Sequence, residues 1–381
     1  MILSQEHILI QNMARDFALK EIRPVAAKFD ETHEFPKEII QKLGKLGLMG
    51  VAIPEKYAGS GLDCLSYAIA MEEISRGCAG VSVVMSVNNS LVGDPLLKFG
   101  TEEQKEKYLK PLASGQRIGC FMLSEPQSGS DAINQKTSAV KENDYYILNG
   151  TKNFITNGPQ AHFGIVFASS LASSGRGGGS NSISAFIVEK NFSGYKIGKS
   201  DRKLGIAASG TCQIHFDQCK VPKENLLGDE GKGLKIAFST LDGGRIGIAA
   251  QAVGIAVAAM EASVSYAKER KQFGRTIGEF QAVQWMLADM STKIDAARLL
   301  VYRAAQLKDQ GKPYSIESAK AKLFASQTVM EVTTDAVQIF GGYGYMKDYP
   351  VEKYYRDAKI TQIYEGTSEV QRMVIARGML R

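Results

Sequence analysis

The residues best suited to chemistry form the stretch Ile363-Tyr364-Glu365-Gly366-Thr367-Ser368-Glu369, near the C-terminal end of the chain. A carboxylate beside a glycine turn is a candidate proton acceptor, and a neighbouring backbone N–H can stabilise the charge that proton removal generates. A structural explanation also fits, in which one helix stops here and Thr367 or Ser368 caps the next helix. Taken alone, the stretch favours the structural explanation, so the decision depends on the rest of the chain.

Nucleophilic and metal-dependent chemistry receive little support from the sequence. The five cysteines are an odd number without a CxxC pair, so neither a disulfide framework nor a zinc site is indicated. The four histidines show no metal-ligand spacing, and we expect no metal site. A glycine-rich run at 173–180 lacks the signatures of phosphate-binding and dinucleotide-binding loops, and we interpret it as a flexible hairpin loop.

The composition is that of an ordinary globular protein, with 44% hydrophobic and 23% charged residues. The net charge of +6 is mild, and basic residues alternate with acids, as at 268–271, so we expect no nucleic-acid partner. We find no run of about 18 apolar residues and expect no membrane span. The first residues lack the features of a signal or transit peptide, which predicts a cytoplasmic location, or an organellar matrix for a processed chain.

Three blocks of secondary structure must position these residues. Residues 1–115 are a predicted helical N-terminal domain, residues 116–225 a small middle β-domain, and residues 226–381 a C-terminal helical domain. The strands cluster in one block and do not alternate with helices, which argues against a doubly wound dinucleotide-binding fold. The predicted fold class is therefore α+β.

Local signals mark where individual elements begin and end. Pro24 follows an apolar helical pattern and is expected to interrupt the first helix. Asn149-Gly150 and Asn157-Gly158 each follow strand-like residues and predict hairpin turns. From Val283 to Leu307 apolar residues step by three or four, which predicts a long amphipathic helix.

Four segments of the chain together resemble the acyl-CoA dehydrogenase family of flavoproteins. They are Phe121-Met122-Leu123-Ser124-Glu125-Pro126-Gln127-Ser128-Gly129-Ser130-Asp131, Arg270-Lys271-Gln272-Phe273-Gly274, Gln338-Ile339-Phe340-Gly341-Gly342-Tyr343-Gly344, and Tyr355-Arg356-Asp357-Ala358-Lys359 with the stretch at 363–372. The resemblance covers essentially the whole chain and, from Leu241 onward, is strongest to the short-chain (butyryl-CoA) branch. It implies a helical N-terminal domain, a small middle β-domain and a C-terminal four-helix bundle, with FAD between the last two. It also implies a homotetramer built as a dimer of dimers.

The resemblance further implies how FAD is held. Arginine suits a pyrophosphate because its planar donors engage two oxygens at once, and part of the site would lie across a subunit interface. Phe154 stands where many relatives carry tryptophan, which exchanges one flat apolar ring for another. The implied FAD-binding residues are Phe121, Leu123, Ser124, Ser130, Phe154, Ile155, Thr156, Arg270, Phe273, Gln281, Gln338, Gly341, Gly342, Thr367 and Glu369.

By the same resemblance, Glu365 is the catalytic base. It would take the α-proton of an acyl-CoA while the β-hydride passes to flavin N5, which gives a trans-2-enoyl-CoA, and the electrons would then go to an electron-transfer flavoprotein. Some relatives carry the base one residue before Arg245 instead, and that position here is Gly244, which has no side chain to serve. The implied substrate-binding residues are Ser130, Asp242, Arg245, Tyr364 and Gly366.

Three departures from the family pattern bear on the substrate. Ala207 replaces a common arginine, Gly210 replaces a common serine, and Asp94 is an unusual acid near the helix expected to line the acyl pocket. Asp94 fits either a helix cap or solvent-facing acid, or a second carboxylate for an atypical acyl group. The alternative function is therefore the same chemistry on a cyclic or branched acyl-CoA. A non-enzymatic, flavin-bearing DNA-associated protein is disfavoured, because no basic cluster follows Arg372.

Overall fold

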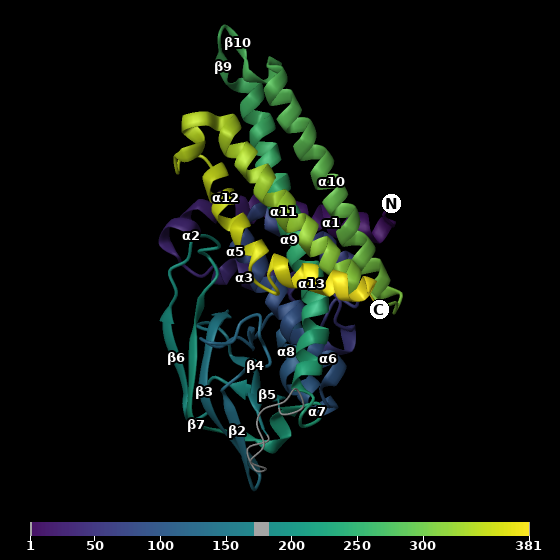
Figure 1. The fold of residues 1–381 in the computed structure, drawn as a ribbon, viewed down its shortest axis with the longest axis vertical. Helices are drawn as coiled ribbons and strands as arrows, with labels where there is room; N and C mark the ends of the chain where they lie inside the picture. Colours follow the sequence, from purple (N-terminus) through teal and green to yellow (C-terminus); the bar gives the residue numbers. More distant parts are fainter. Residues whose placement is uncertain (1, 171–182, 381) are drawn as a thin grey trace.

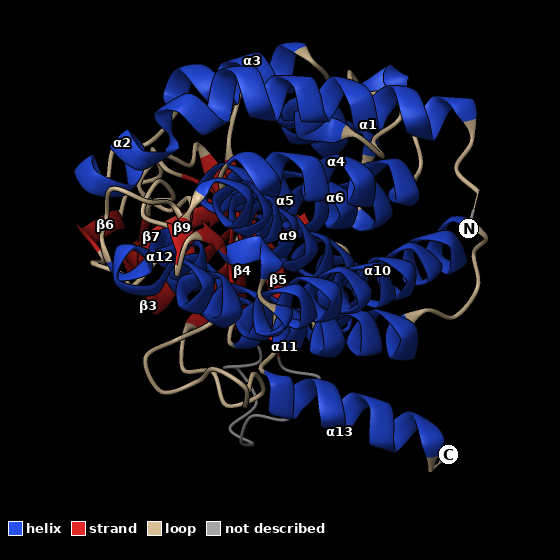
Figure 2. Cartoon of the chain, turned by 90° about the horizontal axis from the view of Figure 1, so that it is seen from above, coloured by secondary structure: helices blue, strands red, loops and turns tan. Residues whose placement is uncertain are grey.

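The structure is a computed structural model that describes residues 2–170 and 183–380, so the predicted loop at 173–180 lies outside the described residues. Helices occupy both ends of the sequence and strands its middle, and the main sheet lies at one end of the molecule (Figure 1). Seen from above, the N-terminal helices form a layer over the long C-terminal helices (Figure 2). The predicted α+β fold is confirmed.

The N-terminal helices pass into one another through short π-helical and 3-10 turns. Ser4 caps the first helix in a reciprocal pair with His7. Pro24 interrupts the helical path as predicted: the preceding helical segment ends at Ile22, a 3-10 turn, Arg23–Val25, holds the proline, and the next α-helix begins after it. The α-helices of this block are α1 (Gln5–Phe17), α2 (Ala26–Thr32), α3 (Lys37–Lys45), α4 (Cys64–Gly77), α5 (Ala79–Ser86), α6 (Asp94–Phe99), α7 (Glu102–Gln104) and α8 (Lys110–Ala113).

The main sheet has the strand order β6-β7-β3-β2-β4-β5-β8, and β1 pairs in parallel with β4. Its strands are β1 (Gly119–Met122), β2 (Ser138–Glu142), β3 (Tyr145–Thr156), β4 (Phe163–Ser169), β5 (Ile183–Glu189), β6 (Tyr195–Ser200), β7 (Thr211–Pro222) and β8 (Leu226–Leu227).

Neither of the two predicted hairpins forms, although one of the two sites is a turn. The turn at Asn149-Gly150 is wrong, because β3 runs through both residues with a register shift between Leu148 and Gly150. Gly150 has φ 148°, and a Cβ there would lie 2.6 Å from Thr137 Oγ1. A glycine is therefore required at this register shift inside the strand. A turn does form at Asn157-Gly158, directly after β3 ends, but it is not a hairpin turn, because β3 and the next strand, β4, are not neighbours in the sheet.

The C-terminal block is built around α9, which packs against α4, α10 and α11. A Cβ on Gly254 of α9 would lie 2.1 Å from the carbonyl oxygen of Glu72 on α4, so glycine allows the two backbones to touch. The two helical blocks consequently share one hydrophobic core. The elements are α9 (Gly233–Glu269), the hairpin β9 (Lys271–Gln272) and β10 (Arg275–Thr276), α10 (Gln281–Asp309), α11 (Ser315–Phe340), α12 (Val351–Lys359) and α13 (Ser368–Met379).

The expectation that no segment suits a membrane span needs a correction. Within residues 2–170 and 183–380, α9 is long and apolar enough to cross a membrane by length and composition alone. However, 83% of its apolar window is buried inside the protein. Packing against the neighbouring helices therefore accounts for its apolar character.

Candidate active site

Glu365 lies in a tight turn between α12 and α13. Its φ is 51° and that of Gly366 is 93°, so two successive residues adopt the left-handed conformation. Thr367 then caps α13, its hydroxyl accepting a hydrogen bond from the Val370 N–H at 3.3 Å. The structural explanation for this stretch is thus correct for Thr367, and the same turn also presents the carboxylate of Glu365.

Glu365 is half-buried, and its carboxylate oxygen Oε2 is buried against α9. A Cβ added to Gly244 would lie 2.1 Å from Glu365 Oε2 and 3.0 Å from Leu91 Cδ2. Among the described residues, Oε2 has no hydrogen-bond partner, although it is buried. Burial raises the pKa of Glu365 to about 7, and the charges of Lys322 and Arg245 oppose that rise. Such a carboxyl exchanges a proton near neutral pH, as a general base must.

Arg245 follows Gly244 on α9 and is 6% exposed. Its Nη1 donates to Asp242 Oδ1 at 2.6 Å, one turn earlier on the same helix. Burial lowers the pKa of Arg245, while the negative charges of Asp242 and Glu365 raise it. Of the predicted substrate residues, Arg245, Tyr364 and Gly366 therefore lie next to Glu365, and Asp242 is linked to it through Arg245. Ser130 instead lies exposed in the loop that follows β1.

A buried ion pair holds the loop that follows β1. Lys152 Nζ donates to Glu125 Oε1 at 2.8 Å, and the two side chains are 0% and 2% exposed. Lys152 also donates to the Leu123 carbonyl at 3.2 Å, while Glu125 accepts from the N–H groups of Lys136 and Thr137. Burial raises the pKa of Glu125, but the Lys152 charge outweighs it and holds that pKa below its usual range. The sequence analysis did not identify this pair, because the two residues lie 27 positions apart and only the fold brings them together.

The same pair brings the first group of predicted FAD-binding residues together. The Asn153 N–H donates to the Ser124 carbonyl at 2.9 Å, which joins β3 to the loop after β1. Phe154 has φ 58° and is 69% exposed, whereas its neighbour Ile155 is buried in the sheet core. Within this group the Phe154 ring is therefore open to a ligand, and Ile155 can offer only its backbone. Phe121, Leu123, Ser124 and Thr156 lie on these same two segments.

A second group of predicted FAD-binding residues lies at the far end of the long helices. A groove of about 580 Å³ there is lined by residues that include Arg270, Gly341, Gly342 and Tyr343. Gly341 has φ 59°, and nothing within 4 Å would meet a Cβ at either glycine. Phe273, in the turn of the β9–β10 hairpin, is 93% exposed. Gln338 lies in the last turn of α11 and Gln281 begins α10.

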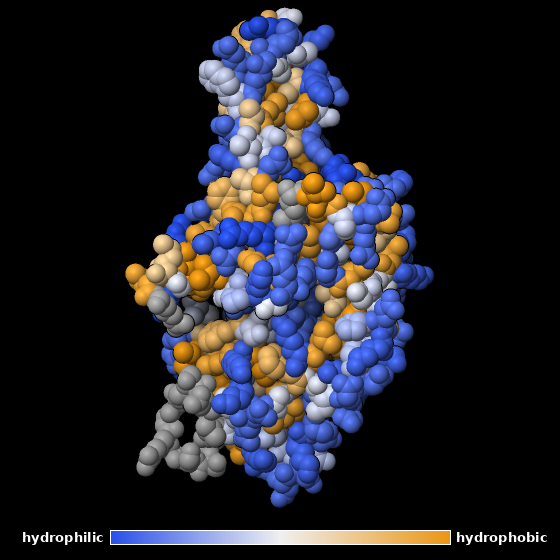
Figure 3. Space-filling model, turned by 90° about the vertical axis from the view of Figure 1, so that its right-hand side faces the viewer, coloured by the Kyte–Doolittle hydropathy of each residue, from blue (hydrophilic) through white to orange (hydrophobic). Residues whose placement is uncertain are grey.

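One copy of the chain does not bring these two groups together. The β9–β10 hairpin lies at the opposite end of the molecule from the main sheet (Figure 1). In the space-filling view, this end of the helices forms a narrow lobe with hydrophobic surface at its base (Figure 3). Both groups nevertheless suit FAD, because exposed flat rings stack on a flavin, and Arg270 beside open glycine backbone suits a pyrophosphate.

The three residues that depart from the family pattern, Asp94, Ala207 and Gly210, are each enclosed by neighbouring residues. Asp94 Oδ1 lies 3.1 Å from Lys308 Nζ, and its Oδ2 lies 2.8 Å from Lys98 Nζ. Burial raises the pKa of Asp94, but the two lysines outweigh it and hold that pKa below its usual range. Asp94 is therefore neither solvent-facing nor an unpaired acid. Ala207 is 7% exposed, and a Cβ at Gly210 would meet Gln160 Oε1 at 2.4 Å.

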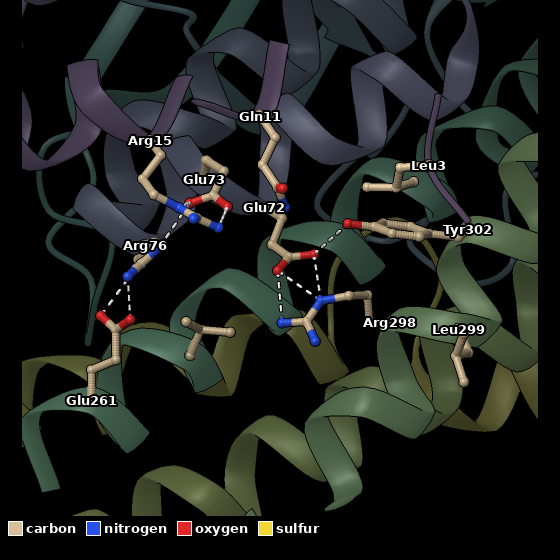
Figure 4. A pocket seen from close by; sticks show the side chains of 11 residues that line it. Leu3, Gln11, Arg15, Glu72, Glu73, Arg76, Glu261, Arg298, Leu299 and Tyr302 are labelled. Atoms are coloured by element: carbon tan, nitrogen blue, oxygen red, sulfur yellow. Dashed lines mark hydrogen bonds and ion pairs between the residues drawn. The ribbon is translucent and has the colours of Figure 1, made fainter. Parts of the chain in front are cut away.

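A separate groove of about 470 Å³ lies among α1, α4, α9 and α10 (Figure 4). Its charged side chains are paired with one another: Arg15 Nη2 lies 2.7 Å from Glu73 Oε1, and Arg298 Nη2 lies 2.9 Å from Glu72 Oε1. Arg76 is paired with Glu261 in the same way. These pairs link the N-terminal helices to the C-terminal helices, and we assign the groove a structural role.

Comparison with known proteins agrees with these features along the whole chain. Models of the N-terminal, middle and C-terminal domains of acyl-CoA dehydrogenase match residues 4–116, 120–219 and 231–380. The chain is 52% identical to the short-chain specific acyl-CoA dehydrogenase of Clostridium acetobutylicum, over 100% of this chain and 99% of that one.

Solved structures give the same result. Butyryl-CoA dehydrogenase from Megasphaera elsdenii has a TM-score of 0.97 and 49% identity, with 100% of both chains covered. A chain from a study of the electron transferring flavoprotein of Acidaminococcus fermentans has a TM-score of 0.97 and 54% identity, covering 100% of this chain and 99% of that one. An acyl-CoA dehydrogenase complexed with FAD from Bacillus anthracis has a TM-score of 0.93 and 37% identity, covering 100% of this chain and 67% of that one.

Proposed function

The chain belongs to the acyl-CoA dehydrogenase family of FAD-dependent enzymes, and we propose that its substrates are short-chain acyl-CoA thioesters such as butyryl-CoA. The observation that carries the proposal is the buried Glu365 carboxylate, which faces the side-chain-free Gly244 and has a pKa of about 7. The similarity to the Clostridium acetobutylicum and Megasphaera elsdenii enzymes supports a short acyl group.

In this proposal Glu365 removes the α-proton of the thioester. Its raised pKa makes it a stronger base than an exposed glutamate, and about half of the molecules are still ionised at pH 7. Bound FAD supplies the acceptor for the β-hydride. The chain itself must orient the carboxylate and exclude water. Tyr364 contributes to the orientation, because its hydroxyl donates to Gln251 Oε1 on α9.

FAD is held, in our proposal, by residues from two copies of the chain. The loop after β1, Phe154 and Thr156 would contact the flavin from one copy, and Arg270, Gly341 and Gly342 would contact the phosphates from the other. The support is the separation of these groups at opposite ends of one chain (Figure 1). A homotetramer, built as a dimer of dimers, supplies the second copy.

The proposed electron acceptor is an electron-transfer flavoprotein. The support is the close similarity to the chain from the Acidaminococcus fermentans study. A cyclic or branched acyl-CoA is not favoured as the main substrate. The acid that suggested it, Asp94, is already paired with Lys308 and Lys98 and offers no unpaired carboxylate to an atypical acyl group.

The test is an anaerobic visible spectrum of the FAD-loaded protein, recorded before and after butyryl-CoA is added. We expect the flavin band to bleach as the substrate is oxidised. A flavin band that does not bleach with butyryl-CoA but does with a branched or cyclic acyl-CoA would refute the short-chain assignment. A protein that binds no FAD after reconstitution would refute the assignment of the two FAD-binding groups.

A further inference from the structure

A lysine that the sequence analysis did not single out contacts the turn that carries Glu365. Lys322 lies on α11, and its side chain is fully buried. Its Nζ donates to the carbonyl oxygen of Tyr364 at 2.9 Å and also to that of Gly366. These are the carbonyls on either side of Glu365. The ammonium group therefore binds the backbone of the turn on both sides of Glu365.

The burial of this lysine needs an explanation, because an unpaired ammonium group is costly to bury. Among the described residues, the two carbonyls are the only hydrogen-bond acceptors that Lys322 has, and no carboxylate lies within ion-pair distance of it. Burial lowers the pKa of Lys322 to about 8, and the negative charge of Glu365 opposes that change. A side chain that only filled space at this position would be apolar.

The turn itself requires outside support. Glu365 adopts a left-handed φ of 51°, which a residue with a Cβ adopts only when its surroundings enforce it. Lys322 supplies part of that support from α11. Gln371 supplies further support from α13, with its Nε2 donating to the Gly366 carbonyl at 2.8 Å and to that of Glu365 at 3.4 Å.

We propose that Lys322 is a positioning residue for the catalytic base. Its ammonium group fixes the left-handed turn through the Tyr364 and Gly366 carbonyls, and its positive charge favours the ionised form of the Glu365 carboxylate. This inference rests on the proposed role of Glu365 as the base. It adds that the position and the ionised form of the base depend on a second helix, α11, and not on its own turn alone.

The groups that face Glu365 come from several elements. Lys322 on α11 and Arg245 on α9 both lower its pKa, and Asp242 on α9 is paired with Arg245. Tyr67 on α4 and Tyr364 also lie near the Glu365 charge. Burial raises the pKa of both tyrosine hydroxyls, and they therefore stay neutral. The exposed carboxylate of Glu369 on α13 raises the pKa of Lys322. Removal of the Lys322 charge therefore raises the pKa of Glu365 further above 7.

The test is the pH profile of kcat for the FAD-loaded enzyme with three variants. In Lys322→Met we expect the acid limb to move up by at least about one pH unit, with a fall of about fivefold or more in kcat at pH 7. Lys322→Arg keeps the charge but not the compact donor group, so its acid limb should stay in place while kcat falls. Lys320→Met is the control, since Lys320 lies on the same helix with its side chain 44% exposed, and it should match the wild type.

A second readout does not depend on turnover. An infrared titration of the FAD-loaded protein should show a carboxyl that ionises near pH 7, is absent from Glu365→Gln, and moves to higher pH in Lys322→Met. If this carboxyl titrates at the same pH with and without the Lys322 charge, the inference is overturned. If Lys322→Met does not fold, wild-type kcat in Lys322→Arg overturns it. If the wild type shows the carboxyl but oxidises no short-chain acyl-CoA, the proposed substrate fails and this inference stands.

Discussion

Replacement of Glu365 by glutamine should make the protein more stable at alkaline pH while removing its activity. The carboxylate is buried, so the folded protein resists its ionisation, whereas the unfolded chain does not. An ordinary glutamate has a pKa of about 4.5, and burial raises that of Glu365 to about 7. The difference, at 1.36 kcal/mol per pKa unit, corresponds to about 3 kcal/mol of stability lost on ionisation.

The size of the effect depends on pH. Between pH 4.5 and pH 7 the folded protein binds more protons at this site than the unfolded chain, so its stability falls as the pH rises. Above pH 7 the loss is complete. Glutamine carries no charge and removes the loss, so Glu365→Gln should gain about 3 kcal/mol at pH 8 and less than about 1 kcal/mol at pH 5.

The assay is urea unfolding of the FAD-loaded wild type and variant at both pH values, with turnover measured on the same samples. Glu103→Gln is the control, because Glu103 is exposed in α7, far from the proposed site residues, and its own backbone N–H and the Thr101 hydroxyl lower its pKa. That variant should lose stability slightly at pH 8 and keep its turnover. Equal stabilities of Glu365→Gln and wild type at pH 8, or the same gain at both pH values, would refute the reasoning.

Three further changes test other parts of the site. Lys152→Met leaves the Glu125 carboxylate buried without its partner and should cost about 3–5 kcal/mol in urea unfolding, and a loss below about 1 kcal/mol would contradict the assigned role. Gly244→Ala adds a Cβ that would lie 2.1 Å from Glu365 Oε2, so we expect a fall of about tenfold or more in kcat with FAD retained, and unchanged kcat would show that the carboxylate lies elsewhere. Arg270→Ala should lower FAD affinity by about tenfold or more in a fluorescence titration, and full affinity would argue against a phosphate contact there.

Sequence patterns predicted the parts of the fold that depend on neighbours along the chain. The order of helices and strands follows from local periodicity, and the turn at Glu365-Gly366 follows from the glycine. The Asn149-Gly150 prediction failed because both halves of β3 pair with the same partner strand, β7, and only that tertiary pairing distinguishes a register shift from a hairpin. The interruption at Pro24 was predictable, because it follows from the proline itself and not from a distant partner.

The buried charges could not be predicted, because their roles are set by segments far apart in sequence. Lys320 and Lys322 lie two residues apart in an ordinary helical stretch, yet one is largely exposed and the other is fully buried. The available signal was the row of small residues around Lys322, since Ala319, Ala321 and Ala325 mark the packed face of α11. Lys152 carried no comparable signal, because register shifts on both sides of it break the alternation along β3.

The chemistry of Glu365 is therefore set by a balance between its burial and its neighbours. Burial alone would push its pKa far enough to leave the carboxyl protonated at neutral pH, which would make it useless as a base. Lys322 on α11 and Arg245 on α9 oppose that effect, and Gly244 leaves room for the carboxylate between the two helices. Replacement of either Lys322 or Arg245 therefore changes the pKa of Glu365, although Glu365 itself is unchanged. The activity of this enzyme should accordingly be as sensitive to the packing of α9 against α11 as to the residues that contact its substrate.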